Sequence, residues 1–449
     1  MLTDIVYQTL VNLAPTPRYW IAFSGGLDST CLLHILASLR SRLAIPISAI
    51  HLNHGLQSNS DAWEQHCQHV CDQLDIDIII QKLRIHLAKG ESLEAIARIA
   101  RLQSYQRFIA ANETILTAHH QDDQIETVLL QLLRGSGLPG LAAMPVRSSL
   151  SPGWLVRPLL GITRNQLMTY AEANRLCWIE DQSNQDTKFD RNYLRHQVIP
   201  HLKQRWPKCT TTITRSASHC GAADSLLSNL VAPYVTTASG NYPGTLSKAV
   251  LLAMDVELCN AVLRFWIAQH GYPVPNHKHL AQIRNEVLTA APDRWPVVAW
   301  SQTEIRSYRD DIFIMAPLPS KCTDTVLPWL SNTVAVLPAG LGCLRCEYTT
   351  IAHHVLAPND ILALNIRFAV TGQRCQLPNT SKKHKIRDLY PQYAIPNWLR
   401  PYIPLIYLDD QLVAIAGICN CGSVMPTHGI NIGWDNSVLA DLVKIIVTA

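Results

Sequence analysis

The fold is decided by Ile21-Ala22-Phe23-Ser24-Gly25-Gly26-Leu27-Asp28-Ser29-Thr30. An apolar run leads into two adjacent glycines, and a helix-like pattern begins near Ser29. Paired glycines let backbone N–H groups approach an anion closely, and the helix that follows points its positive end at that anion. We therefore predict a strand, a phosphate-binding turn and a helix at the first strand of an α/β domain. A tight turn that only needs a Ser or Asp helix cap is the structural alternative.

The side chains of this loop indicate the chemistry it serves. Ser24 and Ser29 offer hydroxyl donors. The carboxylate of Asp28 would repel a phosphate, so its expected task is to hold Mg²⁺ against the phosphates. Because no lysine follows the glycines, the loop is not the Walker type that grips the β- and γ-phosphates.

A second polar cluster, at residues 117–127, follows another apolar run. The carboxyl ends of parallel strands meet at one edge of a sheet, where ligands of α/β domains bind. His119 is placed there to act on a proton or on developing charge, and Asp123 to complete Mg²⁺ coordination with Asp28. Two histidines and two carboxylates also suit zinc, but phosphate chemistry favours Mg²⁺.

The first two hundred residues alternate short apolar runs with amphipathic stretches, which is typical of a parallel sheet covered by helices. Beyond Pro207 the pattern becomes mainly helical, and after about residue 317 short β-like runs follow. We predict an α/β catalytic domain at 1–215, a mainly helical domain at 216–318 and a small α+β domain at 328–449. The predicted strands are 19–23, 45–52, 76–82, 114–118, 333–337, 405–408 and 412–416, and the predicted helices are 29–40, 61–74, 92–111, 123–133, 249–269 and 278–289.

Composition narrows the class of protein. Of the 449 residues, 48% are hydrophobic and 16% charged, with no apolar run of membrane-spanning length and no charged-then-apolar amino terminus. We therefore expect a soluble cytoplasmic protein that does not bind a membrane. The 13 cysteines are odd in number and scattered, so we expect reduced thiols. The single CxxC of Cys343 and Cys346 has no second pair with which to form a tetrahedral zinc site.

Positive charge is concentrated near the carboxyl terminus. The net charge is only +4, but between Arg367 and Arg400 seven Lys or Arg face one acidic residue, Asp388. Such a cluster is suited to neutralising phosphates, although a solvated face is an equally good interpretation of the charges alone.

Further stretches occur in an order that resembles the long form of the tRNA(Ile)-lysidine synthetase family, whose catalytic domain is a PP-loop ATP-pyrophosphatase of the adenine nucleotide alpha hydrolase-like fold. Besides the SGGxDS loop and the HHxDD cluster, they are HLNHGL from His51, GESLEAIAR from Gly90, LRGSGLPGL from Leu133, RPLL from Arg157, WIEDQSN from Trp178, RNYLR from Arg191, GQR from Gly372, IPNWLR from Ile395 and PLIY from Pro404. One departure is Gln57, where the family often has arginine.

The resemblance implies an enzyme that transfers AMP from ATP to the C2 oxygen of the wobble cytidine in the AUA-reading tRNA(Ile), which has a CAU anticodon. Free L-lysine then displaces the AMP and forms lysidine. It implies ATP contacts from Ser24, Gly25, Gly26, Leu27, Asp28, Ser29, His51, Arg134 and Gly135. It implies Mg²⁺ ligation by Asp28 and Asp123, and catalytic roles for Asp28, His119, Asp123 and Arg195. It also implies tRNA contacts from Arg98, Arg101, Lys382, Lys383, Lys385 and Arg387, and a homodimer.

Several alternatives stay open at this point. A PP-loop tRNA thiolase would use the same adenylylation but needs reactive cysteines, and no CxxC lies in the predicted catalytic domain. A non-catalytic nucleotide-sensing RNA-binding protein would not need the metal-binding carboxylates. Among single residues, His120 is alternatively only a helix cap, Glu126 a partner of Arg134, and Arg98 part of a solvated face. The spacing of Arg98, Arg101 and Tyr105 also predicts that they share one helical face towards a polyanion.

Overall fold

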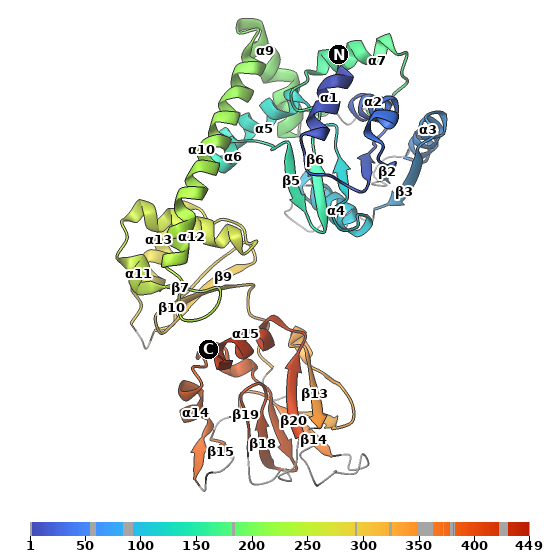
Figure 1. Cartoon of the computed structure of the whole chain (residues 1–449). Coiled ribbons are helices and arrows are strands. Elements are labelled where there is room, and N and C mark those ends of the chain that lie inside the picture. Colours follow the sequence, from blue (N-terminus) through green and yellow to red (C-terminus); the bar gives the residue numbers. More distant parts are fainter. Residues whose placement is uncertain are drawn as a thin grey trace. The chain divides into compact units, whose positions relative to one another are not determined.

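The computed structural model describes residues 2–53, 60–83, 93–181, 185–291, 294–322, 326–348, 362–370, 372–377, 380, 382–421 and 430–448 (Figure 1). Parts of three family-like stretches, at residues 54–56, 90–92 and 182–184, lie outside these ranges, and so does Gln57. The chain divides into two compact units, Met1–Leu227 and Ser228–Ala449.

The first unit is built on a mainly parallel sheet with strand order β3-β2-β1-β4-β6-β5. All neighbouring strands pair parallel except β5, which is antiparallel to β6. The strands are β1 (Tyr19–Ala22), β2 (Ile47–Asn53), β3 (Asp77–Lys82), β4 (Thr114–Leu116), β5 (Arg147–Leu150) and β6 (Gly153–Val156).

Helices cover both faces of this sheet. Side chains alternate along a strand, so Tyr19 and Ile21 of β1 enter one core while Trp20 enters the other. The first core is shared with α1, α2, α3 and α7, and the second with α4. The helices are α1 (Leu2–Val11), α2 (Leu27–Leu43), α3 (Ser60–Gln73), α4 (Leu93–Phe108), α5 (Gln121–Leu133), α6 (Leu138–Leu141), α7 (Arg164–Ala173), α8 (Asp190–Tyr193), the π-helix η2 (Leu194–Val198), α9 (Ile199–Arg205) and α10 (Cys209–Thr237).

The predicted strands and helices of this unit match the structure to within a few residues at each end. The prediction did not include α1, α6, β5, β6 or the helices of this unit after residue 160. One of these, α7, has a capping box that the sequence offers as T-x-x-Q, in which Thr163 and Gln166 each bind the other's backbone N–H. Helix α10 runs across the predicted domain boundary at residue 215.

The first part of the second unit packs helices against an antiparallel sheet of order β7-β10-β9-β8, so this region is less purely helical than its sequence indicates. The predicted helix 249–269 is broken where Asp255 caps a new helix by accepting a hydrogen bond from Leu258 N over 2.8 Å. The elements are β7 (Leu246–Ser247), α11 (Lys248–Leu252), α12 (Val256–Gln269), α13 (His277–Gln282), the π-helix η3 (Ile283–Leu288), β8 (Val297–Trp300), β9 (Thr303–Tyr308) and β10 (Asp311–Met315).

The carboxy-terminal part is rich in antiparallel strands around a large apolar core. The predicted strand 405–408 coincides with β17, and 412–416 overlaps β18, whereas only two residues of 333–337 form a strand. The strands are β11 (Leu327–Leu330), β12 (Ala335–Val336), β13 (Cys343–Tyr348), β14 (Ala363–Arg367), β15 (Arg374–Gln376), β16 (Lys383–Lys385), β17 (Leu405–Leu408), β18 (Gln411–Ile415), β19 (Cys419–Asn420) and β20 (Ile430–Asp435). The helices are the 3₁₀ turns η4 (Pro338–Gly340) and η5 (Arg400–Tyr402), with α14 (Ile386–Gln392) and α15 (Val438–Thr448).

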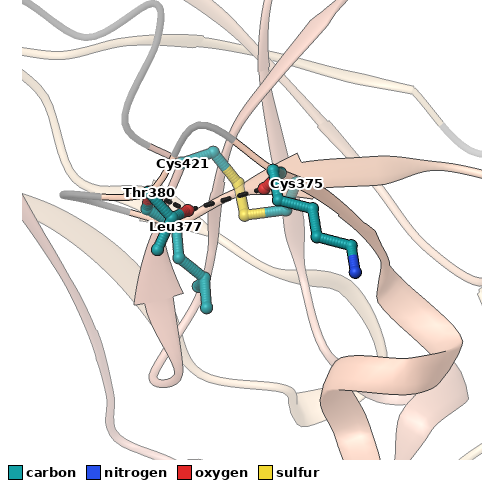
Figure 2. Close-up of a disulfide and its surroundings, with 5 residues drawn as sticks. Cys375, Leu377, Thr380 and Cys421 are labelled. Carbon is teal, nitrogen blue, oxygen red and sulfur yellow. Dashed lines mark hydrogen bonds between the residues drawn. A yellow bond between two sulfur atoms is a disulfide. The ribbon is translucent and has the colours of Figure 1, made fainter.

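A disulfide between Cys375 and Cys421 corrects the expectation that all thiols are reduced (Figure 2). The two residues are 46 positions apart, and folding brings their Cα atoms to 5.3 Å. Sequence spacing gave no sign of this pair, because Cys375 lies in β15 and Cys421 follows β19. The bond joins the β15–β16 hairpin, where the basic cluster lies, to the neighbouring sheet.

None of the helices in the described ranges combines the length and the apolar character that a membrane span requires.

Candidate active site

The candidate site lies where the direction of strand addition reverses in the sheet of the first unit. β1 pairs with β2 on one side and with β4 on the other, so the chain builds outward from β1 in both directions. The loops after β1 and β4 therefore leave the same edge side by side, at the position where ligands bind in open α/β sheets. The SGGLDS loop follows β1, and the HHQDD cluster follows β4.

The loop after β1 has the backbone that an anion cradle needs. Gly25 has φ of +80°, and Gly26 is the N-cap of α2 but supplies no side chain to satisfy the helix N–H groups. Ser29 Oγ accepts from Ser24 N over 3.2 Å and lies 3.0 Å from Ser24 Oγ, which ties the two ends of the loop together. The first turn of a 17-residue helix thus faces the loop with free donors and the positive end of its dipole.

Ile179 fixes this loop from a distant part of the chain. Its N–H donates to Gly25 O over 2.9 Å. A Cβ atom on Gly25 would lie 2.9 Å from Ile179 Cδ1 and 3.0 Å from Cys67 Sγ, so a side chain at this position would have to displace these atoms. Ile179, from the family-like stretch that begins at Trp178, therefore packs directly against the loop.

His51 supports the same loop through a hydrogen bond to the residue that precedes it, Phe23. His51 is buried at the end of β2, and its Nδ1–H donates to Phe23 O over 2.9 Å. Burial lowers the pKa of His51, so the ring is neutral at pH 7. The structure thus brings His51 to the base of the loop, as a support for its backbone.

His120 lies between the two carboxylates predicted to hold the metal. Its Nε2 is 3.5 Å from Asp28 Oδ2, and its Nδ1 is 3.6 Å from Asp123 Oδ2. It also caps α5 in a reciprocal box, in which His120 N donates to Asp123 Oδ2 over 2.9 Å and Asp123 N to His120 Nδ1 over 3.4 Å. Burial disfavours a charged ring here, but the hydrogen bond to Asp28 and the negative charge of Asp123 outweigh it and raise the pKa of His120. His120 therefore does cap α5, but it is not only a cap, because the same ring also contacts Asp28.

Arg195 joins the site through a buried carboxylate. Its Nε donates to Glu126 Oε1 over 2.6 Å, and its Nη2 donates to Glu126 Oε2 over 3.0 Å and to Asp123 Oδ1 over 3.2 Å. Arg191, one turn earlier, donates to the same Glu126 over 2.8 Å. Glu126 is 1% exposed and pairs with these two arginines, so the alternative pairing with Arg134 is wrong. The arginine stands in the π-helix η2, a helix type that often marks functional sites.

His119 is held in the neutral form. Its Nδ1 lies 2.9 Å from Thr117 Oγ1. Burial lowers the pKa of His119 more strongly than the nearby negative charge of Asp123 raises it. At neutral pH the ring therefore offers an uncharged N–H, which is suited to hydrogen-bonding an oxygen on which charge develops.

The donor set around Asp28 fits Mg²⁺. Asp28 Oδ1 is buried and has no hydrogen-bond partner among the described residues. Buried polar atoms usually have a partner, and a bound cation would provide one here. Asp123 is more constrained, because Arg195 and His120 N already bind its two oxygens. Across the described ranges, no three His, Cys, Asp or Glu side chains group as a protein-only metal site. One unpartnered carboxylate oxygen beside a loop of the anion-binding type fits a metal held by one or two carboxylates and substrate phosphates.

Other predicted site residues lie apart from this centre. Arg134 is the C-cap of α5, 14 residues beyond the capping His120 and thus about 20 Å along the helix axis, and Gly135 follows it. Arg98 and Arg101 are on the exposed side of α4. Tyr105 lies on the same helix at the predicted spacing, but its ring is buried in the core beneath α4, so the prediction that it faces a polyanion with the two arginines is wrong.

The predicted tRNA-binding cations form an exposed group in the second unit. Lys383 and Lys385 lie in β16 of the hairpin, and Arg374 of β15 is opposite Lys385. Arg387 lies in the first turn of α14 and pairs with Asp388 at 3.3 Å. The four cations are Lys382, Lys383, Lys385 and Arg387.

Sequence reasoning missed Arg191 and Ile179 as members of the site. The four-residue spacing of Arg191 and Arg195 was a usable signal, because it places both guanidinium groups on one face of a helix. Their convergence on Glu126 needed the fold, since about 65 residues separate Arg191 from that carboxylate. The contact of Ile179 is made by its backbone N–H, which nearly every residue type has, so the sequence does not reveal it.

Three family models match this chain. A PP-loop domain model matches residues 3–202, a TilS substrate binding domain model matches residues 246–313, and a TilS substrate C-terminal domain model matches residues 364–432.

Curated relatives match along nearly the whole chain. The tRNA(Ile)-lysidine synthase of Coxiella burnetii is 39% identical over 429 residues, covering 96% of this chain and 95% of the relative. That of Methylococcus capsulatus is 36% identical and covers 90% of this chain and 92% of the relative. That of Serratia proteamaculans is 39% identical, with coverage of 89% and 90%. A solved U34-tRNA thiolase from Methanococcus maripaludis has 16% identity and a TM-score of 0.42 over 49% of this chain and 77% of its own, which carries no argument about function.

Proposed function

We propose, starting from the fact that the chain belongs to the tRNA(Ile)-lysidine synthase family, that it joins free L-lysine to C2 of the wobble cytidine in tRNA(Ile) with a CAU anticodon. ATP supplies the driving force. The substrates are ATP, lysine and the tRNA, and the products are the lysidine-bearing tRNA, AMP and pyrophosphate.

The reaction has two substitutions. First, the C2 oxygen of the cytidine attacks the α-phosphorus of ATP, the bond between the α- and β-phosphates breaks, and pyrophosphate leaves. Second, the amine of lysine attacks C2 and expels AMP, with loss of a proton from the nitrogen. Activation has to come first, because a pyrimidine carbonyl oxygen is a poor leaving group until it carries AMP.

The loop after β1 binds the phosphates in this proposal. Its backbone N–H groups and the amino end of α2 face the anion, and Ser24 and Ser29 add hydroxyls. Asp28 and Asp123 would hold Mg²⁺, which neutralises phosphate charge when bound. His120 fixes the spacing of these two carboxylates from the protein side.

Two further groups act on the transferring atoms. The neutral His119 donates a hydrogen bond to an oxygen that gains charge in the transition state. Arg195 provides a fixed positive charge whose orientation is set by Glu126 and Asp123, which suits a departing pyrophosphate. Both side chains are already oriented by hydrogen bonds, His119 by Thr117 and Arg195 by Glu126 and Asp123.

The observation that carries the proposal is the convergence of a phosphate-type loop, an unpartnered buried carboxylate oxygen and a pre-oriented arginine at the reversal point of one sheet. A non-catalytic nucleotide sensor has no need of the last two. Burial raises the pKa of Cys31, Cys67 and Cys71 to about 12, which makes these three thiols poor nucleophiles for a thiolase. Cys177 is exposed but has no CxxC partner.

The experiment is lysine incorporation. The full-length protein is incubated with ATP, radiolabelled lysine and tRNA(Ile) with a CAU anticodon, and methionine tRNA with the same anticodon serves as the matched RNA. We expect ATP-dependent label in the isoleucine tRNA and much less in the methionine tRNA. Absence of label together with absence of pyrophosphate release would contradict the proposal.

We also propose where the enzyme acts and in which oligomeric state. Its substrates are cytoplasmic molecules, so we place it in the cytoplasm, and we expect a homodimer. Sedimentation velocity tests the second point, since a single species near the chain mass of 50.1 kDa would exclude the dimer.

A further inference from the structure

An exposed tryptophan marks a second surface of the first unit. Trp206 is 56% exposed at the end of α9, although such a large apolar ring normally gains free energy by burial. Its backbone is well anchored, because Trp206 N donates to Leu202 O over 2.7 Å and Cys209 N donates to Trp206 O over 2.9 Å. The ring is therefore presented by a fixed main chain.

The ring borders an open hollow of about 560 Å³ between the end of α9 and the start of α10. Apolar atoms of Leu202, Pro207 and Ile213 form much of its lining, together with Trp206. This volume is within the range of small-molecule sites. A flat apolar group can thus lie against the indole ring while keeping one edge in water.

The charged residues of this hollow are all positive. Arg205 and Lys208 line the hollow together with Trp206. The Arg205 guanidinium lies 5.5 Å from the centre of the Trp206 ring, within the range of a cation–π contact. An aromatic platform with cations beside it is the arrangement that proteins use for an unstacked base and its phosphates.

The hollow is connected to the catalytic arginine by a nearly continuous helical segment. Arg195 lies in η2, which leads directly into α9, and Arg205 is the last residue of α9. Ten helical residues span about 15 Å. That distance corresponds to roughly four nucleotides of a stacked strand, at about 3.4 Å per nucleotide.

We infer that Trp206 is a stacking platform for an unpaired base of the substrate RNA, with Arg205 and Lys208 binding the adjacent phosphates. The inference rests on the proposed function for the identity of that RNA. The platform holds a nucleotide a few positions from the modified base, so it orients the loop strand while the target base lies at the catalytic centre. It is a binding residue and takes no part in the chemistry.

The test measures RNA binding by the full-length protein. A seven-nucleotide single strand and an anticodon stem-loop serve as probes, with Trp206→Ala, Trp206→Phe and the wild type compared by fluorescence anisotropy. Loss of one base–aromatic stack is worth about 1–3 kcal/mol, so Trp206→Ala should bind about fivefold to 150-fold more weakly. Trp206→Phe retains a ring and should recover most of the affinity. The loss should appear in the KM for tRNA, with kcat and ATP affinity unchanged.

Phosphate contacts are tested separately through salt. Replacing Arg205 and Lys208 by alanine should lower the slope of log affinity against log salt by about 0.7 for each lost single-strand contact. Ile5→Ala is the matched control, because Ile5 is 48% exposed beside a hollow of the same unit that has no arginine or lysine in its lining. This control should leave RNA binding unchanged.

Unchanged RNA affinity in Trp206→Ala would overturn the inference, and so would an equal loss in Ile5→Ala. A loss that Phe does not rescue and that extends to ATP binding would assign Trp206 a structural role. If the wild type binds both probes through Trp206 yet makes no lysidine, the proposed function fails while the platform stands. If lysidine forms normally in Trp206→Ala at unchanged KM, only the platform fails.

Discussion

The Arg195 guanidinium donates to both carboxylate oxygens of Glu126, over 2.6 and 3.0 Å. This paired arrangement fixes the plane of the guanidinium, and its Nη2 is then directed also to Asp123. Because Arg191 shares the same carboxylate, removal of Glu126 leaves two arginines without their main partner.

Glu126→Gln should therefore impair both stability and catalysis. We expect the free energy of unfolding to fall by about 2 kcal/mol, below the usual cost of breaking a buried pair because Arg191 and Arg195 are 23% and 31% exposed. We also expect kcat to fall about 100-fold, since Arg195 loses its orientation. Glu113→Gln is the control, because Glu113 binds Trp20 Nε1 and Ala110 N away from the site. A variant as active as the wild type would show that Glu126 does not position Arg195.

Asp28→Ala should abolish pyrophosphate release while the protein stays folded. The lost carboxylate removes the unpartnered oxygen assigned to Mg²⁺, so we expect at least about a 100-fold loss of rate. Pyrophosphate release is measured over a range of MgCl₂ concentrations, with circular dichroism as the check on folding. Full activity at ordinary Mg²⁺ would exclude Asp28 as a metal ligand.

Gly25→Ala should weaken ATP binding through the backbone. Its φ of +80° strains any residue with a Cβ, and that atom would meet Ile179 and Cys67. The strain alone costs about 1–2 kcal/mol. If only the ATP-bound conformation of the loop carries this cost, the affinity for ATP falls roughly tenfold. Isothermal titration with ATP measures this, and Gly161→Ala, at a glycine with open space around it, should bind normally. Equal affinity of the two variants would argue against the cradle.

Neutralising Lys382, Lys383, Lys385 and Arg387 together should weaken tRNA binding and spare ATP binding. Each lost phosphate contact should lower the salt slope of tRNA affinity by about 0.9, the value for duplex nucleic acid. Lys278→Ala, at an exposed lysine of α13, is the comparison at another surface. A parallel loss of ATP affinity in the fourfold variant would contradict the division of labour between the units.

The first unit should lose stability in mild acid. Burial lowers the pKa of His34, whose Nδ1 lies 2.8 Å from Tyr170 OH, below its usual value of 6.5. As the pH falls below about 6.5, the unfolded chain takes up a proton that the folded chain does not, so the free energy of unfolding decreases until the folded pKa is passed. Urea unfolding at pH 7.5 and 5.5 should show a smaller decrease for His34→Gln than for the wild type. Identical decreases would show that His34 does not contribute.

The sequence predicts the catalytic fold well because its signals are local. The strand before Ser24 and the helix after Gly26 are visible in residue pattern alone, and glycine pairs have a known backbone use. The same holds for the cap at His120. The general behaviour of parallel sheets also predicted that the loops after β1 and β4 leave the same edge, whereas the strand order that makes β1 and β4 neighbours came from the structure.

Other features depend on contacts between distant segments and could not be predicted in this way. The sequence offered Arg134, directly after the same predicted helix, as an alternative partner for Glu126. The true partners lie some 65 residues away. Tyr105 shows the reverse error, since its spacing matched two exposed arginines while its ring enters the core. The disulfide of Cys375 and Cys421 likewise required the fold.

The most direct test of the central claim follows the fate of the α-phosphate. The enzyme is incubated with tRNA(Ile) and ATP labelled at the α-phosphate, first without lysine and then with it. The account predicts that label becomes attached to the tRNA while unlabelled pyrophosphate is released, and that lysine then displaces the label as AMP. Release of the γ-phosphate as orthophosphate, with no label on the tRNA at any time, would contradict it.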